Sequence, residues 1–101
     1  MASCTVEKYL MVLTSKLTQY DVSLAKREMK RGGRANIYRL GHFLEAAGKV
    51  REDVGDSVDK GDEAALERLR ASIKKRFEDD FPPAKNVLKQ IGQGRCSIVG
   101  R

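Results

Sequence analysis

Hydrophobic residues recur along the first part of the chain with alternating spacings of three and four, which is typical of helices packed along one face. The first row comprises Val6, Leu10, Leu13, Leu17, Tyr20 and Leu24. The second row, interrupted at Arg51, comprises Ile37, Leu40, Leu44, Ala47, Val54 and Val58. Two rows of similar length joined by a short basic loop predict a long antiparallel helical hairpin.

The ends of these two helices are marked by capping residues. Ser3 or Thr5 caps the first helix, and Gly32-Gly33 is expected to end it. Asn36 is a suitable N-cap for the second helix, which should reach about Asp59. The two helices would then be of nearly equal length, as a hairpin requires.

The second helix has features beyond its row. Phe43 and Val50 widen its apolar face, so we expect it to be the central helix of the fold. The side chain of Arg51 has two interpretations. It either lies along the row with its guanidinium in water, which we favour, or meets a carboxylate across the interface.

Glycines recur at every seventh position of this helix, at Gly41, Gly48 and Gly55. Each glycine in a helix interior costs about 1 kcal/mol relative to alanine. We therefore favour a function for the spacing, namely a smooth stripe where another backbone packs closely. The alternative is that Gly55 marks the frayed helix end and that the other two positions are coincidental.

The rest of the chain predicts a third helix and a short fourth one. Asp62 caps the third helix, whose apolar stripe comprises Leu66, Leu69, Ile73 and Phe77. Pro82-Pro83 ends it and precedes a short helix over about 83–91. The fold class is therefore all-α: a helical bundle with a single domain over residues 1–91 and a flexible C-terminal tail over residues 92–101.

The composition indicates that this bundle has a thin core. Only 6% of the 101 residues are aromatic, and none is tryptophan. Small helical bundles of this kind often complete their cores by association. We therefore expect a homo-oligomer, most simply a dimer.

No apolar run reaches the roughly 18 residues that a membrane-spanning helix needs, so we expect no membrane partner. The first five residues lack the basic start and apolar stretch of a signal peptide, so we expect a cytoplasmic protein. In a reducing compartment, Cys4 and Cys96 should be free thiols rather than a disulfide.

Residues that could carry catalysis are sparse. His42 is the only histidine, and no His-x-x-x-His, Glu-x-x-His or Cys-x-x-Cys motif occurs. The carboxylates cluster within Glu52–Asp59 and Glu78–Asp80, at helix surfaces or ends, where solvated charge is the ordinary explanation. We therefore expect no enzyme activity, no metal site and no cofactor.

The net charge of +6 arises from two basic regions, one around the first loop and one over residues 82–101. The basic residues around the first loop are Lys26, Arg27, Lys30, Arg31, Arg34 and Arg39, with Glu28 as the one acid among them. Such a cluster attracts polyanions through counterion release. Gly32-Gly33 at its centre forms either an anion-binding nest or a solvated turn, and we favour the turn.

Two functions from different classes follow. The leading prediction is a non-enzymatic helical interaction or adaptor protein, which presents helical faces to a second copy or to another protein. The alternative is a nucleic-acid or polyanion binder that uses the basic cluster over residues 26–39. Against the alternative, only Tyr38 lies nearby to stack on bases, and the helices are too long for a helix-turn-helix reader.

Overall fold

The computed structural model describes residues 4–30, 37–78 and 81–96, with the backbone alone at residues 24, 25, 27–30 and 37–40. These residues form α1 (Val6–Lys30), α2 (Ile37–Asp53), α3 (Glu63–Arg76) and α4 (Pro82–Gln93). A short 3₁₀ turn, η1 (Gly55–Ser57), follows α2. The described part of the chain is all-helical, which confirms the predicted fold class.

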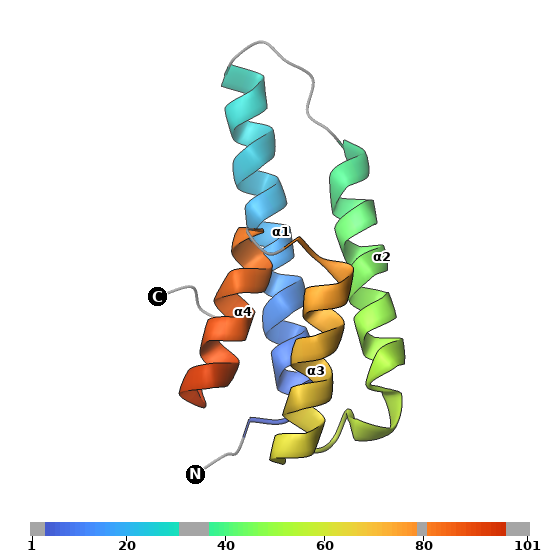
Figure 1. Ribbon diagram of the computed structural model, residues 1–101. Coiled ribbons are helices and arrows are strands. Elements are labelled where there is room, and N and C mark those ends of the chain that lie inside the picture. The colour runs from blue at the N-terminus through green and yellow to red at the C-terminus, as the bar shows by residue number, and fades with distance from the viewer. Residues whose placement is uncertain (1–3, 31–36, 79–80, 97–101) are drawn as a thin grey trace.

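The four helices run alternately in opposite directions, so that neighbours in sequence are also neighbours in space (Figure 1). α3 and α4 lie beside the first half of α1. The loop end of the α1/α2 hairpin extends beyond them, which makes the molecule elongated, with extents of 47 × 26 × 20 Å. This hairpin is the one that the two hydrophobic rows predict.

The start of α1 is fixed by its own cap and by a distant part of the chain. Thr5 Oγ1 accepts a hydrogen bond from the backbone N–H of Lys8 at 3.4 Å, as expected of an N-cap. The N–H of Val6 donates to the carbonyl oxygen of Lys60 at 2.8 Å. The connection between α2 and α3 therefore satisfies a backbone donor that the helix itself leaves unpaired.

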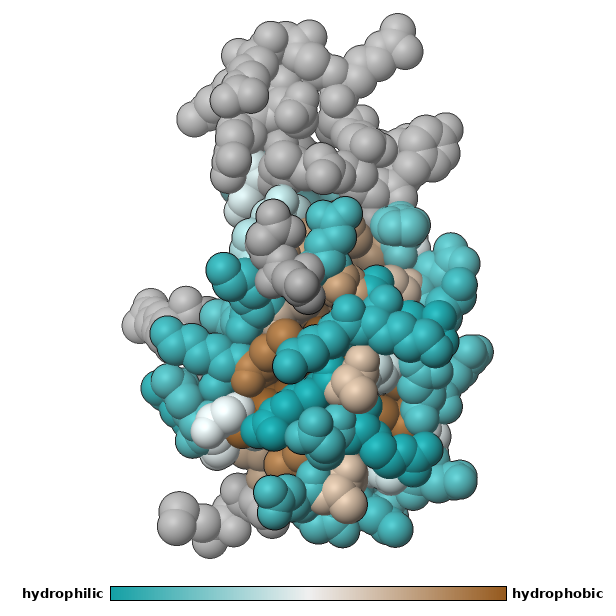
Figure 2. All heavy atoms as spheres, in the orientation of Figure 1, coloured by the Kyte–Doolittle hydropathy of each residue, from teal (hydrophilic) through white to brown (hydrophobic). Residues whose placement is uncertain are grey.

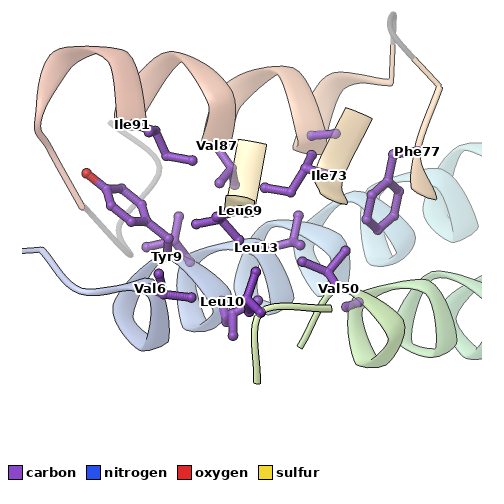
Figure 3. Packing of buried hydrophobic residues seen from close by; sticks show 14 of the residues in the cluster. Val6, Tyr9, Leu10, Leu13, Val50, Leu69, Ile73, Phe77, Val87 and Ile91 are labelled. Carbon is purple, nitrogen blue, oxygen red and sulfur yellow. The ribbon is translucent and has the colours of Figure 1, made fainter. Parts of the chain in front are cut away.

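α1 is the central helix, contrary to the prediction that α2 would be. Its side chains that are at most 4% exposed are Val6, Tyr9, Leu10, Val12, Leu13 and Leu17. Tyr9 and Val12 lie outside the predicted row, and Tyr9 reaches from α1 toward α4 (Figure 3). α1 therefore buries two faces, because it packs against both α2 and α4. Truncating one of its buried leucines to alanine would cost about 2–5 kcal/mol.

α2 is shorter than predicted, and it buries a different side from the predicted one. It ends at Asp53 rather than near Asp59, since the chain tightens into η1. Val50 is fully buried, whereas Leu44 of the predicted row is 39% exposed. The reason is that α2 packs against α3 as well as α1, which moves its buried side toward Phe43 and Val50.

An aromatic cluster packs at the junction of α1, α2 and the connection between α3 and α4. It contains all three phenylalanines of the chain together with Tyr20. Phe81 is at its centre, with ring centroids 4.7 Å from Phe43, 5.2 Å from Tyr20 and 5.6 Å from Phe77. The aromatic residues of this cluster therefore come from three segments of the chain.

α3 and α4 begin and end with the expected chemistry. The Asp62 carboxylate accepts from the N–H of Ala65 at 2.8 Å, which confirms it as the cap of α3. α4 begins with Pro82-Pro83, and Gly94 ends it with a φ of 68°, a left-handed conformation that glycine adopts without strain. α4 continues to Gln93, two residues beyond the end predicted for the fourth helix at about Ile91.

The two cysteines form a disulfide, so the prediction of free thiols is wrong. Cys4 precedes α1 and Cys96 follows α4, and the antiparallel arrangement of these helices brings their Cα atoms to 5.8 Å. The bond joins residues 92 positions apart and links the segment before α1 to the segment after α4. The backbone at Cys4 and Thr5 also passes close to Gly61, where an added Cβ would collide with the carbonyl oxygen of Cys4.

The free-thiol prediction assumed a reducing compartment. Disulfides persist mainly in oxidising compartments and are rare in the cytosol. The bond between Cys4 and Cys96 therefore does not support that assumption. None of the described helices is both long enough and apolar enough to cross a membrane.

Candidate interaction surface

Large hydrophobic side chains are exposed on one side of the described structure only. They are Met11 and Val22 on α1, at 50% and 48% exposure, and Leu44 on α2, at 39%. Most of the remaining large apolar side chains in the described residues are buried or half-buried against the core. All three residues belong to the α1/α2 hairpin.

An ion pair marks how the two helices are aligned. Both terminal nitrogens of Arg51 donate to the Glu7 carboxylate, at 2.8 and 2.9 Å. The hydrogen bonds from Arg51 lower the pKa of Glu7. Both side chains remain about half exposed, so the pair contributes less than about 1 kcal/mol. Of the two interpretations of Arg51, the one we did not favour is correct: it meets a carboxylate, and that carboxylate lies in the same chain.

The exposed residues of α1 and α2 lie side by side along this alignment. Going up α1 from Glu7, the outward positions at helical spacing are Met11, Thr14, Thr18 and Val22. Going the same way along antiparallel α2 from Arg51, they are Gly48, Leu44 and Gly41. At a rise of about 1.5 Å per residue, Leu44 is level with Thr14 and Gly41 is close to the level of Thr18. We call these seven residues the α1/α2 outer face.

The polar groups of this face need no outside partner. Thr14 Oγ1 donates to the carbonyl oxygen of Leu10, and Thr18 Oγ1 donates to that of Thr14, both at 3.0 Å. Beside them, the Gln19 amide donates to the Ser15 hydroxyl at 3.3 Å. Hydroxyls that bond back to their own helix leave their methyl groups outward. The face is therefore more apolar than its composition indicates.

The glycines leave unoccupied space on the surface of α2. A Cβ at Gly41, Gly48 or Gly55 would meet no atom within 4 Å. No segment of the described chain therefore packs on this stripe. Close packing at these glycines stays a prediction, and it now concerns a second molecule. Gly55 lies in η1 beyond the end of α2, so the helical part of the stripe is Gly41 and Gly48.

The opposite side of the bundle has a different character. With α3 and α4 in front, the surface is mostly hydrophilic, and its hydrophobic residues are recessed (Figure 2). Along α3 the exposed positions include Glu63, Glu67, Lys74 and Lys75. The small side chains of Ala64 and Ala71 interrupt these charges. This contrast makes the α1/α2 outer face the candidate for binding.

A polar junction lies between α2 and α3. The Arg76 guanidinium donates to both oxygens of Asp53, at 3.1 and 3.0 Å, and the Ser72 hydroxyl donates at 2.6 Å. The hydrogen bonds from Arg76, and then that from Ser72, lower the pKa of Asp53 to about 2. Arg68 donates to the backbone oxygen of Asp53 at 3.2 Å. The junction ties the end of α2 to α3 and has the character of a structural contact.

A shallow groove of about 240 Å³ runs beside this junction, lined by residues of α2 and α3 that include His42, Glu45, Lys49 and Lys75. Lys49 lies 3.9 Å from Glu45, so its charge is partly balanced. His42 is exposed on this side. No group of three or more potential metal ligands converges anywhere in the described residues. The absence of enzyme activity accordingly stays a prediction.

The predicted basic cluster falls mostly outside the described residues. Arg31 and Arg34 lie in the segment 31–36, which is not described. Arg27 and Lys30 belong to α1 and Arg39 belongs to α2, but their side chains are not described. Lys26 is exposed on α1. Nucleic-acid binding by this cluster accordingly stays a prediction.

Met11, Thr14, Thr18 and Val22 were not predicted from the sequence as candidate binding residues. Their signal was present as a second row of helical spacing, free of charge, on the outside of the first hydrophobic row. Comparison with known proteins adds no assignment, since no family model, no curated protein and no solved structure matches this chain.

Proposed function

We propose that this protein is a non-enzymatic helical interaction module that binds a protein partner through the α1/α2 outer face. The observation that carries the proposal is that Met11, Val22 and Leu44, the exposed large hydrophobic side chains, lie together on that face. Exposed large hydrophobic side chains on one face are typical of protein–protein interfaces. The hydroxyls of Thr14 and Thr18, which are already satisfied, remove the cost of leaving polar groups unpaired in such an interface.

Site-specific photocrosslinking tests this function. A benzophenone amino acid is placed at Thr14, on the outer face, or at Ala71, on the charged face of α3, in cells that express the full chain. We expect a covalent protein adduct from position 14 and none from position 71. Both positions are exposed and helical, so the two variants are matched in accessibility to the probe.

A second pair of variants shows that the adduct depends on the face itself. In the Met11→Glu, Leu44→Glu background the adduct from position 14 should be lost, because two charges would enter the apolar surface. In the Ala64→Glu, Ala71→Glu background it should persist. A probe at position 14 that gives no adduct, or gives one that both backgrounds retain, would contradict the proposed function.

The nucleic-acid alternative is carried by the sequence alone. Its test is fluorescence anisotropy with random DNA and RNA at low and near-physiological salt, with charge reversal at Arg31 and Arg34. Binding that weakens with salt and is lost in the reversal would support it. Unchanged binding in the reversal would exclude the basic cluster as the contact.

A further inference from the structure

The solvent side of α4 and of the turn after it has hydrogen-bond donors and no acidic side chain. The opposite side of α4 is apolar and is buried through Pro83, Ala84, Val87 and Ile91. Each exposed position from residue 85 to residue 95 is either a glycine or has a side chain that donates hydrogen bonds. These positions, which we call the α4 outer face, are Lys85, Asn86, Lys89, Gly92, Gln93, Gly94 and Arg95.

The positive charges of this face lie close together. Lys85 and Lys89 are four positions apart, so they lie on one side of α4, separated by a rise of about 6 Å. Among the described residues, neither lysine forms an ion pair, and neither does Arg95. No acidic residue follows Asp80 in the sequence. The face therefore presents a local excess of positive charge.

The other polar groups of this region are arranged to donate. The Asn86 side-chain oxygen accepts a hydrogen bond from the Gln90 amide at 2.7 Å, so Asn86 keeps its own amide N–H groups for an outside partner. At the end of α4, the carbonyl oxygen of Gln90 accepts from the N–H of Arg95 at 2.9 Å. The carbonyl oxygen of Ile91 accepts from the N–H of Gly94 at 3.2 Å. These bonds occupy acceptor atoms that would otherwise repel an anion.

We infer that the α4 outer face binds the phosphate backbone of duplex nucleic acid without reading its base sequence. Lysine, arginine, asparagine and glutamine side chains bind phosphate oxygens, and such contacts position a protein without selecting a sequence. Duplex DNA carries one negative charge per about 1.7 Å of its axis, so two lysines one helical turn apart each find a phosphate within reach. Gly92 and Gly94 leave open space beside them, since an added Cβ at either would meet nothing within 4 Å. This contact is independent of the proposed function, because none of its residues belongs to the α1/α2 outer face.

Other polyanions suit this face less well. A single strand binds through stacking of its bases on aromatic rings, and the face has none. Helices that bind an anionic membrane insert apolar side chains into the lipid. The exposed large hydrophobic side chains of the described residues belong to α1 and α2 rather than to α4. A duplex needs only the closely spaced donors that the face has.

Fluorescence anisotropy of the purified full chain, with its disulfide intact, tests the inference with random-sequence duplex DNA and duplex RNA as probes. The variant Lys85→Gln, Lys89→Gln removes two positive charges and keeps a similar helix propensity. We expect it to raise the dissociation constant about tenfold or more at near-physiological salt. The slope of the logarithm of the association constant against that of the salt concentration should become less steep by about 2. The conservative variant Lys85→Arg, Lys89→Arg should bind like the original chain.

Lys49→Gln, Lys75→Gln is the matched control. Both lysines are exposed and helical, and both line the groove between α2 and α3. The change in net charge is the same, so a difference between the two variants reports where the charges lie. In that groove Lys49 is 3.9 Å from Glu45, and Arg76 is held by Asp53, so we expect the control to bind the duplex with little change. Circular dichroism verifies that both variants fold.

Several results would overturn the inference. One is a chain that binds no duplex even at low salt, and another is an equal loss in the α4 variant and the control, because net charge alone would then explain binding. A loss confined to the reversal of Arg31 and Arg34 would place the contact at the basic cluster over residues 26–39 instead. Tighter binding to single strands, to polyglutamate or to anionic lipid vesicles at the same salt would replace the duplex as the partner. Photocrosslinking at Thr14 does not depend on these results, so the proposed function stands or fails separately.

Discussion

At the scale of single residues, Tyr9 is a core residue with an unsatisfied buried polar group. Its side chain is 1% exposed, and its hydroxyl oxygen makes no hydrogen bond to any described residue. Figure 3 shows it reaching from α1 toward the last turn of α4. A buried hydroxyl without a partner forfeits its hydrogen bond to water, which costs about 1–3 kcal/mol. The ring therefore stabilises the bundle while the hydroxyl opposes it.

Replacing Tyr9 with phenylalanine should raise the free energy of unfolding by about 1 kcal/mol, measured by urea denaturation near neutral pH. Burial raises the pKa of Tyr9 above its ordinary value of 10.0, an effect that Arg70 partly offsets. The unfolded chain therefore ionises this residue first, and stability is lost as the pH rises above 10. Tyr9→Phe should lose less stability over that range. A destabilised variant would show that the hydroxyl has a partner that stabilises it.

At the scale of elements, two ion pairs join α2 to its neighbours on opposite sides. Arg51 binds Glu7 on α1, and Asp53 binds Arg76 on α3. Because these residues are two positions apart, they point to different sides of α2. The pairs therefore link one helix to two others.

The pair on the α3 side predicts a loss of stability in acid. The pKa of Asp53 falls from its ordinary value of 3.8 to about 2 on folding, chiefly through its hydrogen bonds with Arg76. A lowered pKa contributes stability that is fully present above pH 3.8 and is lost as the pH falls toward about 2. Urea denaturation across this range should show a smaller loss for Asp53→Asn than for the original chain.

Arg76→Gln provides the matched control for the cause of this shift. It removes the charged donor and keeps a polar side chain, so the midpoint for Asp53, followed by NMR of its carboxyl carbon, should rise toward 3.8. A midpoint that stays near 2 in Arg76→Gln would assign the effect to Ser72 instead.

At the scale of the whole molecule, the disulfide closes the bundle. Cys4 and Cys96 are 92 positions apart, so the bond constrains nearly the entire unfolded chain. α1 and α4 are joined by it at the end of the bundle opposite the loop of the hairpin (Figure 1). A cross-link over so long a loop is expected to stabilise the folded chain strongly.

The double variant Cys4→Ser, Cys96→Ser should lose about 2–5 kcal/mol of unfolding free energy. Dithiothreitol should lower the melting temperature of the original chain and leave that of the variant unchanged. Thermal unfolding followed by circular dichroism, with and without the reductant, measures both effects. If the original chain melted at the same temperature with and without reductant, the bond would contribute no stability.

The helices themselves were predictable from local pattern. The spacing of Val6 to Leu17 determines a buried side of α1, and the caps at Thr5 and Asp62 form as the residue types require. The low aromatic content could also be read from the sequence, but the clustering of the aromatic side chains around Phe81 could not. The uncharged outward row on α1, from Met11 to Val22, could be predicted from the helical spacing. The spacing does not show that this row lies beside Leu44.

By itself, therefore, the sequence determined the helices, their caps and the all-α class, because these depend on residues within a few positions of one another. Only the tertiary structure decided that α1 is central, that Leu44 is exposed and that Cys4 bonds Cys96. Each of these depends on which helices become neighbours, and helix neighbours are set by packing over the whole chain. The α1/α2 outer face is of the same kind, since it exists only once α1 and α2 pack side by side.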